Sequence, residues 1–208
     1  MECVLGMCFK DFVLLASDAT ETHSIMVIKH DSLKMYSVNQ NVMIGVVGEK
    51  GDSHEFAEYV SKNMQLYKFR NGYDVDPFKV AHFARRTLAD ALRSSSPYYV
   101  NSIIAGFDPQ TNQSCLFFLD YLASLIPIPF GAQGYGAFFA NSILDRHFNK
   151  DLNEDDAYLL LTKAIDEIQK RLLVNLPAFK VKIIDKNGQR NLKDIYLKTS
   201  FVIDKQST

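Results

Sequence analysis

The chain has 208 residues, of which 47% are hydrophobic and 23% are charged, so it can bury a core without disulfide staples. Lys and Arg total 23 against 24 Asp and Glu, which leaves a formal net charge of −1. Dedicated nucleic-acid-binding domains usually carry a basic excess, so we expect no nucleic-acid partner. Three cysteines are an odd number, which argues against a disulfide framework and favours a reducing compartment.

Neither a secretory signal nor a membrane span is expected. The first residues carry no basic segment, and charge interrupts them after a short apolar run. The longest apolar stretch, residues 121–130, contains two prolines. It is far shorter than the about 20 residues that a membrane span needs.

The first 48 residues are predicted to form strands. Residues 4–9 and 12–17 are apolar, and the charged pair between them predicts a hairpin. Because nearly every position in both runs is apolar, we expect both faces of these strands to be covered. Residues 33–38 and 42–47 predict a second strand pair.

Two helices are predicted next. Asp52 is the expected N-cap of the first, with Glu55 three residues later in capping-box spacing, and Gly72 marks its end. The second begins more clearly, because Asp76 is a good N-cap and Pro77 stands at the first helical position.

The second half of the chain again predicts strands, then helices, then strands. The proline in residues 124–128 is tolerated at the edge of a sheet, so that segment is expected to be an edge strand. The predicted elements are strands at 99–107, 115–119 and 124–128, helices at 135–147 and from 153 to about 172, and strands at 181–185 and 192–197.

No metal, cofactor or nucleotide site is expected. None of the five histidines lies within ligand spacing of another or of a cysteine pair, and Cys3 and Cys8 should point to opposite faces of one strand. The glycine-rich segments 131–136 and 48–53 lack the spacing of known nucleotide loops, so close backbone packing is their expected role. Anion binding at the helix that follows residue 134 is the alternative.

The order of elements and many local segments resemble the proteasome beta-subunit family, and within it the beta-4 type (beta type-2 in mammalian naming). The resemblance covers about residues 1 to 200; one departure is Gln133, where that type commonly has His. The segments that carry it are Leu14-Leu15-Ala16-Ser17-Asp18, Gly45-Val46-Val47-Gly48, Phe56-Ala57-Glu58-Tyr59-Val60, Gln65-Leu66-Tyr67, Arg70-Asn71-Gly72-Tyr73, Leu88-Ala89-Asp90, Asp120-Tyr121-Leu122-Ala123, Gly134-Tyr135-Gly136-Ala137-Phe138, Ser142-Ile143-Leu144-Asp145-Arg146 and Ile183-Ile184-Asp185-Lys186-Asn187-Gly188.

The resemblance implies an α+β fold, a four-layer αββα sandwich of two antiparallel sheets flanked by helices, like the N-terminal nucleophile hydrolases. It places a single domain at residues 1–197. The tail, residues 198–208, matches poorly; Phe201-Val202-Ile203 is a candidate arm for a partner, and a solvated tail is the alternative.

Active members of the family use a threonine at the start of the mature chain. Its hydroxyl attacks the peptide carbonyl, its α-amine is the base, and a lysine and an aspartate assist. Alignment on Asp18 puts the nucleophile position at about Glu2, whereas the first threonine is Thr20. Asp18 and Lys34 fall on the aspartate and lysine positions.

The family's other active-site elements are missing. Residues 131–133 replace the serines before the third helix, and residues 174–177 replace an aspartate and a serine after the fourth. The chain also begins almost on its first strand, so no propeptide is expected. We therefore expect no catalytic residue, and regard Asp18 and Lys34 as structural relics that hold the strands, with a working charge pair as the alternative.

The predicted function is that of a non-catalytic structural subunit of the 20S proteasome core, in the cytoplasm and nucleus. The resemblance implies an obligate hetero-oligomer with neighbouring beta subunits, the alpha ring and the opposite beta ring as partners, so some apolar side chains should be exposed in the monomer. One alternative is an active hydrolase that uses Cys3 after removal of Met1 and Glu2. Another is a freestanding binding module that uses the same fold.

Overall fold

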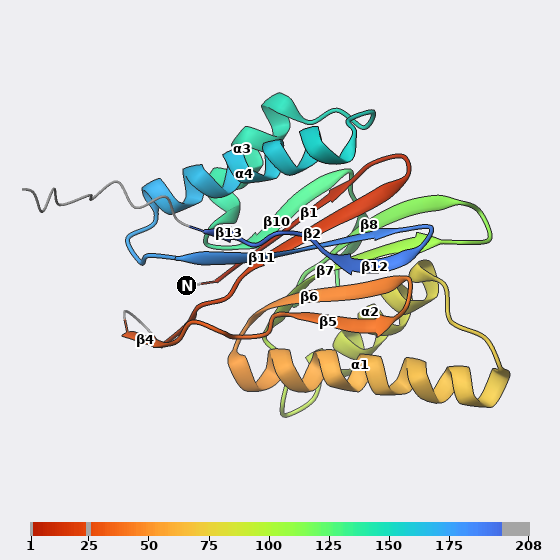
Figure 1. Ribbon diagram of the computed structural model, residues 1–208. Helices are drawn as coiled ribbons and strands as arrows, with labels where there is room; N and C mark the ends of the chain where they lie inside the picture. The colour runs from red at the N-terminus through yellow and green to blue at the C-terminus, as the bar shows by residue number, and fades with distance from the viewer. Residues whose placement is uncertain (1, 24–25, 197–208) are drawn as a thin grey trace, which may run out of the picture.

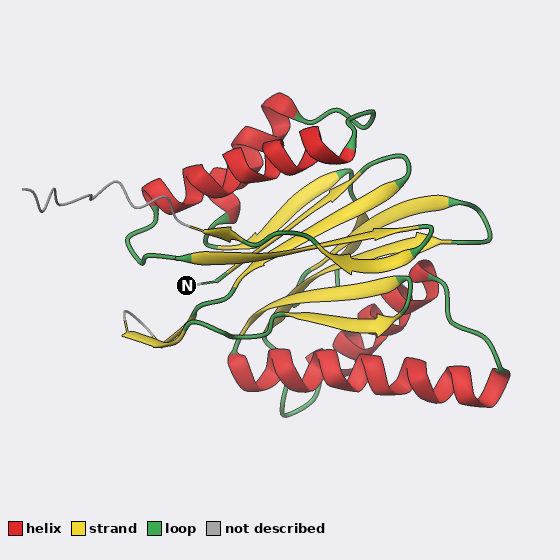
Figure 2. Ribbon diagram, viewed as in Figure 1, coloured by secondary structure: helices red, strands yellow, loops and turns green. Residues whose placement is uncertain are grey.

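The chain forms four layers, as Figures 1 and 2 show for the computed structural model, which describes residues 2–23 and 26–196. Helices α3 (Ala137–His147) and α4 (Glu154–Arg171) form one outer layer. Helices α1 (Lys50–Asn71) and α2 (Pro77–Leu92) form the other, and two antiparallel sheets lie between them. The predicted αββα sandwich is confirmed.

The sheet beneath α3 and α4 runs in the order β10-β1-β2-β11-β12, with β13 also paired to β11. Every residue of β1 and β2 is buried, because helices cover one face and the second sheet covers the other. The strands are β1 (Cys3–Cys8), β2 (Phe12–Asp18), β10 (Phe130–Gly134), β11 (Ala178–Asp185), β12 (Gly188–Asn191) and β13 (Ile195–Tyr196).

The sheet beneath α1 and α2 runs in the simple order β5-β6-β7-β8-β9. Its last strand lies at the edge and contains Pro127, as the sequence predicted. A separate hairpin, β3 and β4, was not predicted. These strands are β5 (Met35–Asn39), β6 (Val42–Gly48), β7 (Val100–Asp108), β8 (Gln113–Leu119) and β9 (Leu125–Pro127), with β3 (Glu21–His23) and β4 (Met26–Lys29) in the hairpin.

The core consists of three apolar clusters, one between each pair of layers. Cys3 belongs to the cluster under α3 and α4 and Cys8 to the cluster between the sheets, so the predicted opposite orientation is confirmed. The sheets approach closely at two glycines. A Cβ on Gly45 would lie 2.7 Å from Val4 Cγ1, and one on Gly6 would lie 2.8 Å from a Leu116 methyl.

Three of the predicted helix boundaries hold. Asp76 caps α2 by accepting a hydrogen bond from Lys79 N at 2.9 Å, and Pro77 is its first residue. Asn153 caps α4, and Gly72 ends α1 in the left-handed conformation with φ +80°.

The predicted N-cap of α1 is wrong. The helix begins at Lys50, and the Glu49 side chain accepts the hydrogen bond from Asp52 N. Asp52 lies inside the first turn, and its carboxylate accepts from Tyr99 N at 2.9 Å. This contact joins residues 47 positions apart, so no local capping pattern could reveal it.

One prediction late in the chain is also wrong, and another is correct only in part. Residues 130–134, predicted as a loop, form β10, because β1 would otherwise present an unpaired edge. The strand directly after the Lys186-Asn187 turn is Gly188–Asn191, because Gly188 pairs with Asp185. Within the predicted strand 192–197, the described residues Ile195–Tyr196 form β13, which also pairs with β11. The predicted partner arm, Phe201-Val202-Ile203, lies outside the described residues.

Candidate functional site

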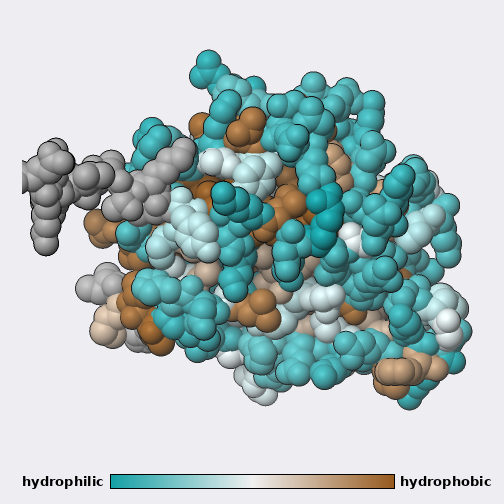
Figure 3. Space-filling view, viewed as in Figure 1, coloured by the Kyte–Doolittle hydropathy of each residue, from teal (hydrophilic) through white to brown (hydrophobic). Residues whose placement is uncertain are grey.

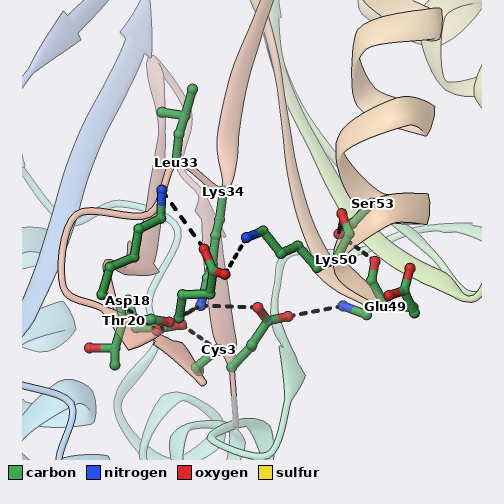
Figure 4. A network of polar contacts seen from close by, with 12 residues as sticks. Cys3, Asp18, Thr20, Leu33, Lys34, Glu49, Lys50 and Ser53 are labelled. Atoms are coloured by element: carbon green, nitrogen blue, oxygen red, sulfur yellow. Dashed lines mark hydrogen bonds and ion pairs between the residues drawn. The ribbon is translucent and has the colours of Figure 1, made fainter. Parts of the chain in front are cut away.

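A buried ion pair joins the end of β2 to the segment before β5. Lys34 Nζ lies 2.8 Å from Asp18 Oδ2, and the two residues are only 4% and 0% exposed. Two backbone N–H groups also donate to the Asp18 carboxylate, from Cys3 at 2.7 Å and from Thr20 at 3.1 Å. Figure 4 shows these contacts converging on Asp18. The structure therefore brings together the two residues that the sequence singled out.

Burial raises the pKa of the Asp18 carboxyl above its ordinary value, and the charge and hydrogen bond of Lys34 oppose that rise. Lys34 also donates to the carbonyl of Thr20 at 2.7 Å. The pair thus holds the end of β2 against the start of β5. Its classification as a relic of a catalytic site remains a prediction.

Glu2, the residue expected near the family's nucleophile position, places its carboxylate beside Lys34. Glu2 Oε1 lies 3.3 Å from Lys34 Nζ, and Glu2 Oε2 accepts a hydrogen bond from Gly48 N at 3.0 Å. The main chain of Glu2 is held as well, because its carbonyl accepts from Tyr135 N at 3.0 Å. The contacts to Gly48 and Tyr135 were not predicted, since no pattern in the sequence signals them.

Cys3 does not present a nucleophile. Its side chain is 0% exposed, and a Cβ placed on Gly136 would lie 2.4 Å from the Cys3 sulfur, so the thiol packs against the backbone before α3. Burial raises the pKa of this thiol well above its ordinary value. Its N–H is already bound to Asp18. This geometry disfavours the alternative in which Cys3 attacks a peptide.

Two pockets adjoin this site, and Glu2 lines both. One, of about 410 Å³, is also lined by Gly48 and Tyr135; the other, of about 280 Å³, is also lined by Lys34. Glu21 lies at both pockets, buried, and is paired with Lys50. The hydrogen bond from Lys50 holds the pKa of Glu21 below its ordinary value. Sequence analysis missed this second ion pair.

The remaining sequence candidates offer no chemistry at this site. Residues 131–133 lie within β10, where Ala132 and Gln133 are buried, and Leu176 of segment 174–177 is fully buried. The Thr20 hydroxyl is buried without a hydrogen-bond partner. Residues 2–23 and 26–196 hold no group of three His, Cys, Asp or Glu side chains arranged to bind a metal ion. None of the helices in that part of the chain is long and apolar enough to cross a membrane.

Comparison with known proteins supplies the family. Residues 1–184 match the family described as "Proteasome subunit". The chain is 41% identical to "Proteasome subunit beta type-2-A" of Arabidopsis thaliana, over 92% of this chain and 93% of that protein. It is 37% identical to "Proteasome subunit beta type-4" of Saccharomyces cerevisiae (93% and 98%) and 40% identical to "Proteasome subunit beta type-2" of Oryza sativa subsp. japonica (91% and 89%). The chain therefore belongs to the proteasome subunit family and is similar, over most of its length, to β-type members.

Proposed function

We propose that this chain is a non-catalytic structural subunit of the 20S proteasome core, one of the β subunits that enclose the chamber for ATP- and ubiquitin-dependent protein degradation. The observation that carries the proposal is the Glu2 carboxylate facing Lys34 at 3.3 Å. A peptide-cleaving site of this family type needs a hydroxyl or a thiol at that place.

The neighbouring side chains do not replace the missing nucleophile. A carboxylate that is already paired with a lysine and a backbone N–H is a weak nucleophile toward an amide. The Cys3 thiol lies in the core. The Thr20 hydroxyl is buried as well, and Thr20 follows the end of β2, whereas the nucleophile of the family stands at the start of the first strand. Asp18 and Lys34 then serve stability rather than catalysis.

Exposed apolar side chains support a role in assembly. Phe69 on α1, Phe138 on α3 and Leu173 after α4 are 86%, 79% and 88% exposed. The brown side chains in Figure 3 next to the grey residues at the lower left belong to β4, whose Met26 and Ile28 are also exposed. Apolar groups on several faces suit a subunit with several protein partners. We propose neighbouring β subunits, the α ring and the opposite β ring as those partners, in the cytoplasm and nucleus.

The proposal is tested on the assembled particle with a peptide electrophile that forms adducts with N-terminal nucleophile hydrolases. We expect intact-mass spectrometry to find adducts on catalytic β subunits and none on this chain. The catalytic subunits of the same particle are the internal control. An adduct on this chain would refute a non-catalytic role.

The assembly part of the proposal has its own test. Gel filtration of a lysate, followed by immunodetection of this chain, should place it in a particle far larger than the monomer. Detection only at the monomer size would favour the freestanding binding module.

A further inference from the structure

We propose that Lys34 Nζ and the Gly48 N–H form a carboxylate-binding site, and that Glu2 is its resident ligand. The inference rests on the proposed non-catalytic function, in which this position carries no nucleophile. The ligand class is a single carboxylate, supplied here by the chain itself and, once Glu2 is shortened, by a small monocarboxylate such as acetate.

The two donors come from separate elements and meet at one side chain. Each Glu2 carboxylate oxygen has its own partner: Lys34 Nζ at 3.3 Å and Gly48 N at 3.0 Å. A carboxylate can meet both partners at once, with one oxygen beside the ammonium and the other accepting from the backbone N–H. The arrangement is therefore specific for the shape of the ligand as well as for its charge.

Removal of the Glu2 carboxylate would take one counter-ion from the buried Lys34 ammonium and the acceptor from the exposed Gly48 N–H. The Lys34 ammonium has three N–H donors and donates hydrogen bonds to Asp18 Oδ2 and to the Thr20 carbonyl, while Glu2 Oε1 lies 3.3 Å from Nζ as an ion-pair partner. Without Glu2, the remaining N–H of Lys34 would have no carboxylate beside it although Lys34 is only 4% exposed, and the Gly48 N–H would have solvent as its acceptor. A buried ammonium that lacks one of its counter-ions favours the entry of an anion.

The charge balance points the same way. Three lysines and three carboxylates form two groups of ion pairs here, Lys34 with Glu2 and Asp18, and Glu21 with Lys29 and Lys50. Loss of the Glu2 charge would leave Lys34 paired with Asp18 alone, beside the second group, in which two lysines share the single Glu21 carboxylate.

The backbone holds Glu2 in place for this contact. Its carbonyl accepts from Tyr135 N, and β1 pairs with β10 from Cys3 onward. Gly134, with φ +86°, permits the close approach, because a Cβ there would lie 2.2 Å from the Glu2 carbonyl oxygen. A preorganised carboxylate needs little ordering to bind, so it competes well against free ligands.

Glu2 therefore lines both pockets and contacts Gly48, which lines one, and Lys34, which lines the other. While it is bound, neither Lys34 nor the Gly48 N–H is available to the carbonyl of a peptide in either pocket. We infer that this occupancy, and not only the missing hydroxyl, prevents the site from holding a substrate.

The test is rescue of the Glu2→Ala full-length chain by acetate. Thermal unfolding is followed in sodium acetate and in sodium chloride of equal ionic strength. We expect Glu2→Ala to unfold at a lower temperature than wild type in chloride, and acetate to recover part of the loss with saturation. Wild type and Glu58→Ala should unfold at the same temperature in the two salts, because Glu58 is an exposed residue on α1 that lines neither pocket. Glu2→Gln, which fills the space, should show no acetate effect.

Equal responses to acetate in Glu2→Ala and Glu58→Ala would overturn the proposal, as would no response in Glu2→Ala. If the isolated variant does not fold, cryo-electron microscopy of the assembled particle carrying Glu2→Ala in acetate decides: density between Lys34 and Gly48 supports the site, and its absence refutes it. The peptide-electrophile assay reads the proposed function separately, since an adduct on the wild-type chain would refute that function without affecting acetate rescue.

Discussion

Lys34 and Asp18 form an ion pair of 2.8 Å at the junction of two strands, and hardly any of either side chain is exposed to solvent. Such a pair stabilises the folded chain little more than well-packed apolar residues would. Loss of one partner is nevertheless strongly destabilising, because the other charge stays buried and unpaired. This asymmetry gives the pair a structural role that needs no catalysis.

Lys34→Ala is expected to lower the free energy of unfolding by about 3–5 kcal/mol, because Asp18 would remain buried without its counter-ion. Urea denaturation of the full chain measures this. Lys62→Ala is the control, since Lys62 lies on the surface of α1, 4.0 Å from Glu58, and should change stability by less than about 1 kcal/mol. The double variant Asp18→Asn/Lys34→Met should recover part of the loss. A particle that assembles normally with Lys34→Ala but loses one peptidase specificity would contradict the structural role.

All three cysteines should resist alkylation in the folded chain. Burial raises the pKa of the Cys115 thiol to about 12, and it raises the pKa of Cys3 and Cys8 as well. Since the thiolate is the reactive form, iodoacetamide at pH 8 should modify none of them within the time that modifies all three in urea. Peptide mapping by mass spectrometry identifies the labelled positions. Rapid labelling of Cys3 in the folded chain would restore the thiol hydrolase alternative.

The ion pair of Glu21 with Lys50 should make stability depend on acidic pH. The hydrogen bond from Lys50 lowers the pKa of Glu21 in the folded chain. The contribution of this ion pair to the free energy of unfolding is therefore complete above pH 4.5, the ordinary pKa of a glutamate, and it is lost as the pH falls through the lowered pKa of the folded chain. Because Lys50 is 68% exposed at its side chain, solvent screening limits the effect to about 0.5–1 kcal/mol.

The measurement is the difference in unfolding free energy between wild type and Glu21→Gln at pH 7 and again near pH 3. The difference should shrink at the lower pH. A constant difference would show that Glu21 acts by packing rather than by charge.

Substitution of Gly45 tests the contact between the two sheets. In Gly45→Ala the new methyl group would lie 2.7 Å from Val4 Cγ1, so the sheets must shift apart and we expect a loss of about 1–3 kcal/mol. Gly72→Ala separates this effect from backbone strain: no atom lies within 4 Å of its new Cβ, but φ is +80°, which costs about 1–2 kcal/mol. Combining Gly45→Ala with Val4→Ala should reduce the packing penalty of the first change, whereas the cost of Gly72→Ala should be unaffected by Val4→Ala. If the double variant loses as much unfolding free energy as Gly45→Ala and Val4→Ala lose together, the packing explanation is contradicted.

Much of the fold follows from local signals that the sequence carries. Asp76 with Pro77, and Asn153, mark helix starts because a cap is satisfied within three residues. The unbroken apolar runs of β1 and β2 predict burial on both faces for an equally local reason. The resemblance to the proteasome family located Asp18 and Lys34, and the structure places them in contact.

Other features depend on partners that are distant in the chain. Residues 130–134 form a strand only because β1 lies beside them, and Asp52 accepts from Tyr99 rather than capping its own helix. Glu2 meets Gly48 across 46 positions, a contact that only the folded arrangement of β1 and β6 creates. The sequence by itself determined that neither Glu2 nor Cys3, where β1 begins, carries a hydroxyl. Only the tertiary structure decided that a carboxylate occupies that position with both its oxygens bound, because long-range pairing brings those donors together.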